Sequence, residues 1–269
     1  IFLISIIIAA VVGWYDDRHQ LGSFKKIFLM FVTGIPIFIA NLPWIKFVDI
    51  DNPTLPIVGT LRLNIIYPLV LPAIVMIMPN TINMLEGYNG EGSGTTGIAL
   101  IFMLIIAFLK GSFQGILFGI PVLAGVIAFF LVNKYPARVF PGDIGTLVMG
   151  VAVSMIALFG SLEIYMVICF LPHIFNSFYY IASVRGFTES HDLSVKDIYV
   201  DEDDFIYAST EKKAPLTLPR LILAFGRLRE NQMVNNFLAL SVIAGLFSLM
   251  LAFYMIEISL LWTIILSIL

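Results

Sequence analysis

Three short polar runs hold the residues of this chain that could do chemistry. Residues 13–26 read GWYDDRHQLGSFKK, residues 80–92 read NTINMLEGYNGEG, and residues 133–146 read NKYPARVFPGDIGT. They supply two adjacent carboxylates (Asp16 and Asp17), a group of amides, and Asp143 between two glycines. Such oxygen ligands suit Mg²⁺ or Mn²⁺, whereas one cysteine and three histidines offer little to zinc. The runs therefore predict a site for a hard divalent cation, provided that they meet in space.

Each run also has a simpler interpretation when it is taken alone. Asp16 and Asp17 could be ordinary charges at a helix end, although two neighbouring acids at a membrane boundary favour a nearby cation. Gly87 could end a helix as its C-cap, and Asp143 could begin one as its N-cap. A common site is nevertheless favoured, because all three runs are expected to reach the same side of the membrane.

Membrane helices are the elements that would position these runs. The chain is 59% hydrophobic and 12% charged, whereas soluble domains average about 45–50% and about 25%. This composition predicts an all-α, polytopic transmembrane helical bundle, formed by a single membrane-embedded domain over residues 1–269. A span needs about 20 apolar residues, or somewhat fewer with interfacial ends. About eight candidate spans result: 1–15, 27–45, 64–84, 95–110, 114–133, 146–161, 163–183 and 234–256.

Alternation of the spans brings the three runs to one side. If each candidate crosses once, one side receives 16–26, 85–94, 134–145 and 184–233. All Lys and Arg residues except Lys46, Arg62 and Lys110 fall on that side. An excess of positive charge marks the cytoplasmic side. The predicted site therefore lies at the cytoplasmic boundary of the membrane.

The large loop, 184–233, and the C-terminus give weaker signals. The acidic run 201–204 is typical of a solvated turn. Residues 217–232 alternate apolar and basic side chains, which indicates an amphipathic helix on the membrane surface or a short connecting helix. Residues 258–269 are too few to span alone and would extend the preceding helix or lie at the interface.

The ordered motifs resemble those of the polyprenyl-phosphate sugar-1-phosphate transferases. The pair DD, the pattern NxxNxxxGxNG and the stretch YPxRVFxGD follow one another as in that family. The form NKYPARVFPGD most resembles the branch that uses UDP-N-acetylglucosamine (UDP-GlcNAc) and dolichyl phosphate, rather than the bacterial cell-wall branch. The family has about ten spans, and Ile1 lies within an apolar stretch, so we expect an N-terminally truncated fragment.

The resemblance implies roles for matching positions in the reaction centre. Asp16 and Asp17 match the aspartate pair where the lipid phosphate meets the metal centre. Lys26 matches a lysine that contacts phosphate. Asn83 and Asp143 match the two residues that coordinate Mg²⁺. We therefore expect the first three to be catalytic and the last two to be metal ligands.

The resemblance also implies a set of substrate-binding residues. Gly87, Asn89 and Phe140 match positions that shape the uridine site. The large loop departs from the family pattern, because 186–195 contains one histidine, His191, without flanking arginines. His191 would contact the diphosphate together with the nearby Arg185, or it is a plain surface residue. The expected substrate-binding residues are Asn80, Gly87, Asn89, Phe140, Arg185 and His191.

The activity implied by the resemblance is that of a Mg²⁺-dependent phosphotransferase, with Mn²⁺ as the alternative ion. It would transfer N-acetylglucosamine 1-phosphate from UDP-GlcNAc to dolichyl phosphate and release UMP, the first lipid-linked step of N-glycan assembly. Another UDP-N-acetylhexosamine or undecaprenyl phosphate remains open. A cation-coupled transporter is the alternative from another class, although its site would lie near the bilayer midplane.

The expected partners are UDP-GlcNAc, dolichyl or another polyprenyl phosphate, and the lipid bilayer. A homodimer is an open expectation, and no nucleic acid partner is expected. The expected location is the archaeal cell membrane, with the endoplasmic reticulum membrane as the alternative and the active site on the cytoplasmic face.

Overall fold

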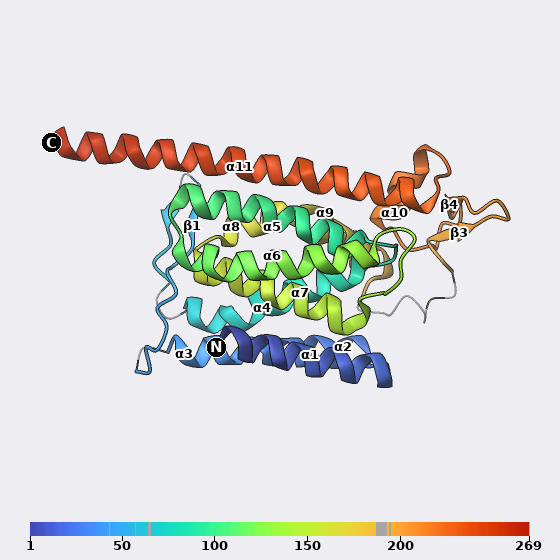
Figure 1. Ribbon diagram of the computed structural model, residues 1–269, viewed down its shortest axis with the longest axis horizontal. Helices are drawn as coiled ribbons and strands as arrows, with labels where there is room; N and C mark the ends of the chain where they lie inside the picture. Colours follow the sequence, from blue (N-terminus) through green and yellow to red (C-terminus); the bar gives the residue numbers. More distant parts are fainter. Residues whose placement is uncertain (43, 57, 64–65, 187–192, 194, 269) are drawn as a thin grey trace.

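Helices that run roughly side by side form the body of the molecule (Figure 1). The structure is a computed structural model that describes residues 1–42, 44–56, 58–63, 66–186, 193 and 195–268. Within these ranges, strands are confined to two short antiparallel pairs. The predicted all-α transmembrane bundle is therefore confirmed.

The order of elements follows the predicted alternation of spans and loops. The strands are β1 (Thr54–Leu55), β2 (Gly59–Thr60), β3 (Ile198–Val200) and β4 (Ile206–Ala208). One 3₁₀ turn, η2, covers Leu223–Phe225. The helices are α1 (Phe2–His19), α2 (Ser23–Thr33), α3 (Ile35–Ala40), α4 (Ile66–Leu85), α5 (Glu91–Lys110), α6 (Phe113–Asn133), α7 (Gly142–Gly160), α8 (Glu163–Cys169), α9 (Leu171–Val184), α10 (Leu218–Ile222) and α11 (Glu230–Ile268).

Six or seven segments of the described chain are long and apolar enough to cross a membrane. The seventh is the pair α8 and α9, which together form a span bent by 69°. The remaining predicted span, 1–15, corresponds to α1, whose 18 residues include Asp16, Asp17 and Arg18 in its last turn. The six others are Ser23–Ala40, Ile66–Leu85, Glu91–Lys110, Phe113–Asn133, Gly142–Gly160 and Glu230–Ile258.

Glycines let α7 lie close against its neighbours α1 and α4. A Cβ on Gly13 of α1 would lie 2.6 Å from the Cα of Ile144, and a Cβ on Gly150 would overlap the backbone of Pro79 in α4. Small residues permit such close approach, and close packing is what holds membrane helices together. The ends of α1, α4 and α7 that carry the three polar runs consequently meet.

The loop between α9 and α11 forms a small lobe at the same end of the bundle (Figure 1). β3 pairs with β4, and Ile206 of β4 makes a further antiparallel bridge with Leu228. The acidic run 201–204 forms the predicted turn between the two strands. Arg220 braces the lobe by donating hydrogen bonds to backbone carbonyl oxygens, including those of Ser209 and Ala214.

The prediction of an amphipathic helix over 217–232 is wrong. Helix α10 covers only Leu218–Ile222, which confirms the alternative of a short connecting helix. Gly226 turns the chain with a φ of +144°, and Leu228 then joins the strand pair instead of a helix. Further on, α11 runs unbroken to Ile268, so the last stretch extends the preceding helix.

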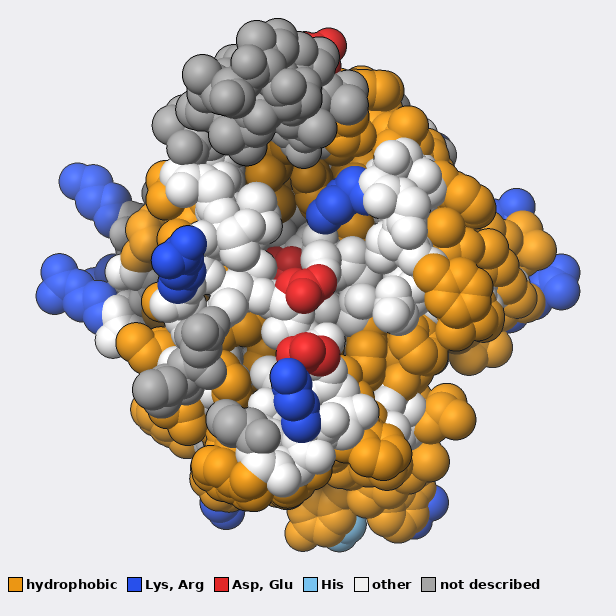
Figure 2. Space-filling view, turned by 90° about the vertical axis from the view of Figure 1, so that its left-hand side faces the viewer, with side chains coloured by type: hydrophobic (Ala, Val, Ile, Leu, Met, Phe, Trp, Pro, Cys, Tyr) orange, Lys and Arg blue, Asp and Glu red, His pale blue; other side chains and the backbone are white. Residues whose placement is uncertain are grey.

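The opposite end of the bundle has a polar centre of its own. Figure 2 shows acidic side chains in a hollow at the middle of this end, surrounded by polar and then hydrophobic groups. The Tyr67 hydroxyl donates to Glu163 at 2.7 Å, and the Lys110 ammonium donates to the carbonyl oxygen of Ser161 at 2.6 Å. The Ser161 hydroxyl donates to Asp51 at 3.2 Å. These contacts fasten α4 to the start of α8, and the end of α5 to the end of α7.

Candidate active site

Asp17 caps α7 from the neighbouring helix α1. Its carboxylate accepts hydrogen bonds from the backbone N–H groups of Asp143 at 2.8 Å and Ile144 at 3.3 Å. The first amides of a helix have no partners inside it, and a carboxylate there also meets the positive end of the helix dipole. Gly142 leaves the space that Asp17 occupies, since a Cβ on it would lie 2.8 Å from the carboxylate. Asp143 is therefore not the N-cap, and its own side chain is available.

Lys26 lies between two carboxylates from different helices. Its Nζ atom is 2.6 Å from Oδ2 of Asp16 and 3.1 Å from Oδ1 of Asp143. The side chains of Lys26 and Asp16 are only 12% and 2% exposed, so both charges are largely withdrawn from water. The second oxygen of Asp16 accepts from the backbone N–H of Leu21 at 2.7 Å. The two neighbouring aspartates thus differ in role, because Asp17 holds a helix end while Asp16 faces the cation.

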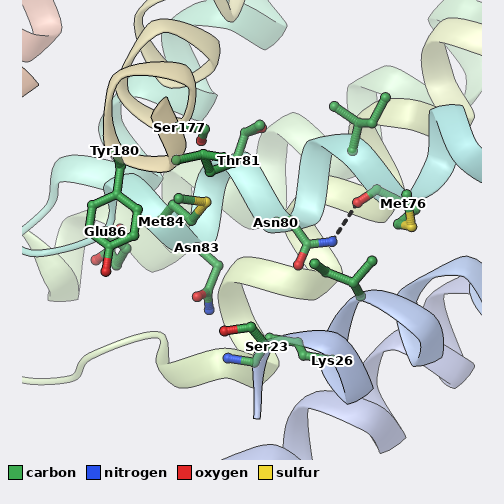
Figure 3. Close-up of a pocket in the computed structure, with 13 residues that line it drawn as sticks. Ser23, Lys26, Met76, Asn80, Thr81, Asn83, Met84, Glu86, Ser177 and Tyr180 are labelled. Carbon is green, nitrogen blue, oxygen red and sulfur yellow. Dashed lines mark hydrogen bonds between the residues drawn. The ribbon is translucent and has the colours of Figure 1, made fainter. Parts of the chain in front are cut away.

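Asn83 of α4 completes this centre. Its amide nitrogen donates to Oδ1 of Asp143, the same oxygen that Lys26 contacts, and to the Thr146 hydroxyl at 2.9 Å. Figure 3 shows Asn83 on the face of α4 that is turned towards Ser23 and Lys26 of α2. Residues from three helices, α2, α4 and α7, therefore meet around one carboxylate oxygen, and Asp16 of α1 joins them through Lys26. The predicted convergence of Asp16, Asn83 and Asp143 is present in the structure.

A first cavity, of about 380 Å³, opens beside this centre between α2, α4 and α9 (Figure 3). Its polar end includes Lys26 and Asn83, and Ser177 and Tyr180 enter it from α9. The rest is more apolar, with Ile27, Met76, Ile77 and Ile181 in its wall. The cavity therefore has a mostly apolar wall with a few polar side chains.

A second cavity, of about 540 Å³, lies on the other side of the centre and is more polar. Gly87 and Phe140, both predicted to shape the uridine site, line this cavity, and the Phe140 ring is 62% exposed. The wall also contains Asp16, Asp17, Gln20, Leu21, Pro141, Gly142, Asp143 and Thr146. Three side chains line both cavities: Lys26, Asn83 and Glu86.

Asn89 connects the loop after α4 to two other parts of the chain. Its backbone N–H and its side-chain amide donate to Glu230, the first residue of α11. Its side-chain oxygen accepts from the backbone N–H of Ala137 at 2.9 Å. These bonds place Asn89 as a brace of the loop, and its contact with uridine stays a prediction.

The remaining predicted binding residues lie apart from the centre or outside the described residues. Asn80 lines the first cavity and donates to the backbone oxygen of Met76 in its own helix at 2.7 Å. Arg185 is exposed at the end of α9 and lines neither of the two cavities. His191 lies outside the described residues.

Sequence reasoning missed three residues of this region. Glu86 received no role, because a glutamate just after a helix is typical of a solvated loop. Thr146 could have been found from its spacing, since it follows Asp143 by three residues on the same helix face. Glu230 gave no signal, because its partner Asn89 is 141 residues away in the chain.

The chemistry of the centre fits a hard divalent cation. Carboxylate oxygens of Asp16 and Asp143 and the amide of Asn83 meet beside a polar cavity, and such groups are the ligands that Mg²⁺ prefers. Within the described part of the chain, no three His, Cys, Asp or Glu side chains form a group that could hold a metal ion. Mg²⁺ commonly needs only one or two carboxylates when substrate phosphates supply other oxygens. The Mg²⁺ assignment therefore stays a proposal.

Comparison with known proteins decides the family. Residues 1–161 match the family described as glycosyl transferase family 4. The chain belongs to this family. Family 4 membership, together with the apolar helices, makes the protein a multi-pass membrane transferase that moves a sugar phosphate onto a polyprenyl-phosphate lipid.

Archaeal and bacterial relatives in family 4 share much of the chain. A protein of Methanocaldococcus jannaschii with the provisional name of glycosyltransferase is 28% identical over 94% of this chain and 76% of its own length. A protein of Sulfolobus acidocaldarius, provisionally named UDP-N-acetylglucosamine–dolichyl-phosphate N-acetylglucosaminephosphotransferase, is 29% identical over 86% of this chain and 67% of its own length. A phospho-N-acetylmuramoyl-pentapeptide-transferase of Clostridium botulinum is 29% identical over 62% of this chain and 53% of its own length.

Proposed function

We propose that the protein transfers N-acetylglucosamine 1-phosphate from UDP-GlcNAc to dolichyl phosphate and releases UMP, at the cytoplasmic face of an archaeal cell membrane. The proposal depends chiefly on two cavities of different polarity that share a wall, which is formed by Lys26, Asn83 and Glu86. The partly apolar cavity suits a lipid chain, and the polar cavity suits a water-soluble nucleotide sugar. The names of the archaeal relatives support this choice of sugar and lipid.

In the proposed reaction, an oxygen of the lipid phosphate attacks the β-phosphorus of UDP-GlcNAc. The new P–O bond forms while the bond from that phosphorus to the bridging oxygen breaks, and UMP leaves with the electron pair. Such transfers depend mainly on positioning and on neutralisation of charge. A phosphate monoester has a second pKa of about 6, so the attacking oxygen is mostly deprotonated at neutral pH. Direct attack is therefore preferred to an aspartyl intermediate.

The side chains of the centre would divide this work. Lys26 would offset charge on the phosphates, because its ammonium lies at the wall shared by both cavities. Asp16 holds Lys26 in place at 2.6 Å, and Asp17 fixes the start of α7 and with it Asp143. Phe140 would offer its exposed ring to the uracil base, a stacking contact that typically contributes about 1–3 kcal/mol.

Asn83 and Asp143 are the residues that would hold Mg²⁺. When bound, Mg²⁺ neutralises charge that develops on the diphosphate. The transporter alternative is less well supported, because the polar residues gather at helix ends rather than near the middle of the spans.

A reconstituted assay tests the proposed function. Protein in lipid nanodiscs is supplied with UDP-GlcNAc, dolichyl phosphate and Mg²⁺. We expect UMP and lipid-linked N-acetylglucosamine diphosphate to form in equal amounts, and we expect both to vanish when the metal is chelated and to return when Mg²⁺ is restored. Parallel reactions with other UDP-N-acetylhexosamines and with undecaprenyl phosphate decide between the alternatives. Wild-type protein that forms no lipid-linked product from UDP-GlcNAc would contradict the proposal.

A further inference from the structure

Glu86 differs from the two other side chains that line both cavities. Lys26 is paired with Asp16 and Asp143, and Asn83 donates to Asp143 and Thr146. Both carboxyl oxygens of Glu86, in contrast, are buried and bond to no other side chain among the described residues, and the backbone N–H of Gly92 is the donor that acts on this carboxyl. A carboxyl buried without a side-chain partner is costly to keep, so it calls for an explanation such as a ligand.

The space around the Glu86 carboxyl is formed by the backbone of α5. The residue opposite it is Gly92, and a Cβ on Gly92 would overlap an oxygen of Glu86. The absence of that Cβ allows the carboxyl to fold back against α5 at the boundary of the two cavities. Burial raises the pKa of Glu86 to about 7, because desolvation disfavours the charged form.

Glu91, five residues further on, shows what a purely structural glutamate looks like in the same loop. Its Oε2 atom accepts hydrogen bonds from the backbone N–H groups of Gly87 at 2.9 Å and Tyr88 at 3.2 Å. It lines neither of the two cavities. Glu91 therefore holds the loop, whereas Glu86 lines both cavities and makes no bond to another side chain in the described structure.

We propose that Glu86 binds substrate as a neutral carboxylic acid and donates a hydrogen bond to a phosphoryl oxygen of the nucleotide-sugar diphosphate. This inference rests on the proposed function, since it places the donor in the polar cavity. An ionised carboxylate at that position would repel the diphosphate, whereas the protonated acid has one O–H to donate. The titratable side chains that line these cavities beside Glu86 are Asp16, Asp17, Lys26, Asp143 and Tyr180. Glu91 lies outside both cavities but close enough for its charge to interact with that of Glu86.

The sign of the expected pH dependence follows from the donor role. Above a pH of about 7 the Glu86 carboxyl loses its proton, so kcat/KM for UDP-GlcNAc falls as the pH rises through that value. The second ionisation of the lipid phosphate, at a pH of about 6, gives a separate rise on the acid side. Glutamine keeps the shape and can donate without ionising, so Glu86→Gln removes the alkaline fall.

The experiment measures kcat/KM for UDP-GlcNAc from pH 5.5 to 9 in wild type, Glu86→Gln and Glu86→Ala. We expect Glu86→Ala to lose about tenfold to a hundredfold at pH 6.5, mainly through KM, while Glu86→Gln stays within about threefold and shows a flat alkaline limb. Glu163→Gln, a substitution of a half-buried carboxyl at the far end of the bundle, serves as the matched control and keeps the wild-type profile.

Three results would overturn the role of Glu86: an alanine variant as active as wild type, a glutamine variant as impaired as alanine, or an alkaline fall that persists in Glu86→Gln. A Glu86-dependent rise of activity with pH would instead identify a hydrogen-bond acceptor or base, and it also contradicts the proposal. Wild-type turnover of UDP-GlcNAc tests the proposed function by itself, whereas variant-to-wild-type ratios test Glu86 alone. If Glu86→Ala fails to fold, the pH profile of Glu86→Gln still decides.

Discussion

Each end of the helical bundle carries a lysine near carboxylates, yet the two lysines have different partners. At one end, Lys26 lies between the side chains of Asp16 and Asp143 and lines both cavities. At the other end, Lys110 donates to the backbone carbonyl of Ser161, where α7 ends, and lies 5.1 Å from the Tyr165 ring. The nearby Glu163 is paired with a tyrosine hydroxyl rather than with a lysine.

This difference separates polar groups that build a helix bundle from groups that serve a ligand. Around Lys110, the ammonium donates a hydrogen bond to the carbonyl oxygen at the end of α7, and Glu163 accepts one from the Tyr67 hydroxyl. Around Lys26, charges from several helices share one small space and border two cavities, both of which are also lined by Glu86. A charge at a membrane boundary is therefore weak evidence for function, and its partners are much stronger evidence.

The largest expected effect comes from Asp143→Ala. The substitution removes the carboxylate shared by Lys26 and Asn83, so we expect kcat to fall by about a hundredfold to a thousandfold, as for the loss of a main electrostatic stabiliser. The fold should survive, because Asp17 caps α7 through backbone N–H groups. UMP release measures the activity, and a melting curve checks the fold. Activity within tenfold of wild type would remove Asp143 from the reaction centre.

The pair Lys26→Met and Lys110→Met compares the two ends directly. Lys26→Met leaves two carboxylates without their cation, and we expect a loss of about 3 kcal/mol of stability together with most of the activity. Lys110→Met should leave kcat/KM within about twofold, since it lies at the far end from both cavities. Equal losses of activity in the two variants would contradict the distinction between a ligand-binding end around Lys26 and a structural end around Lys110.

The smallest effect on activity is expected from Tyr67→Phe. The change removes the hydroxyl that donates to Glu163, so the stability of the protein should fall by about 1–3 kcal/mol. UMP release should equal that of wild type at a temperature at which both proteins are folded. Thermal unfolding in detergent gives the stability difference. A variant that is as stable as wild type but catalytically impaired would assign this end a part in the reaction.

The sequence alone predicts which site residues lie on the same side of the membrane, because this depends only on the order of the spans. Alternation alone puts Asp16, Asn83 and Asp143 on one side, because each span reverses the chain, and most Lys and Arg residues fall on that same side. Contacts between helices were not readable in this way. That Asp17 caps α7 depends on the close approach of Gly13 to Ile144, which no local pattern reveals.

The errors in the sequence interpretation have local causes. The segment 217–232 has helical spacing, but Gly226 and the bridge from Leu228 to Ile206 take its second half into an extended conformation. Glu86 was overlooked because its burial results from packing against Gly92. Tertiary contacts thus override the local pattern at both places.

The cap that Asp17 places on α7 joins α1 to the backbone N–H of Asp143, a residue 126 positions further along the chain. Because synthesis proceeds from the N-terminus, α1 is made long before its partner, and during that interval the Asp17 carboxylate has no helix to cap. Assembly of the reaction centre is therefore tied to the insertion of α7. A nascent chain that stops short of this helix lacks both Asp143 and the contact that orders it, so the catalytic apparatus forms only after α7 has entered the membrane.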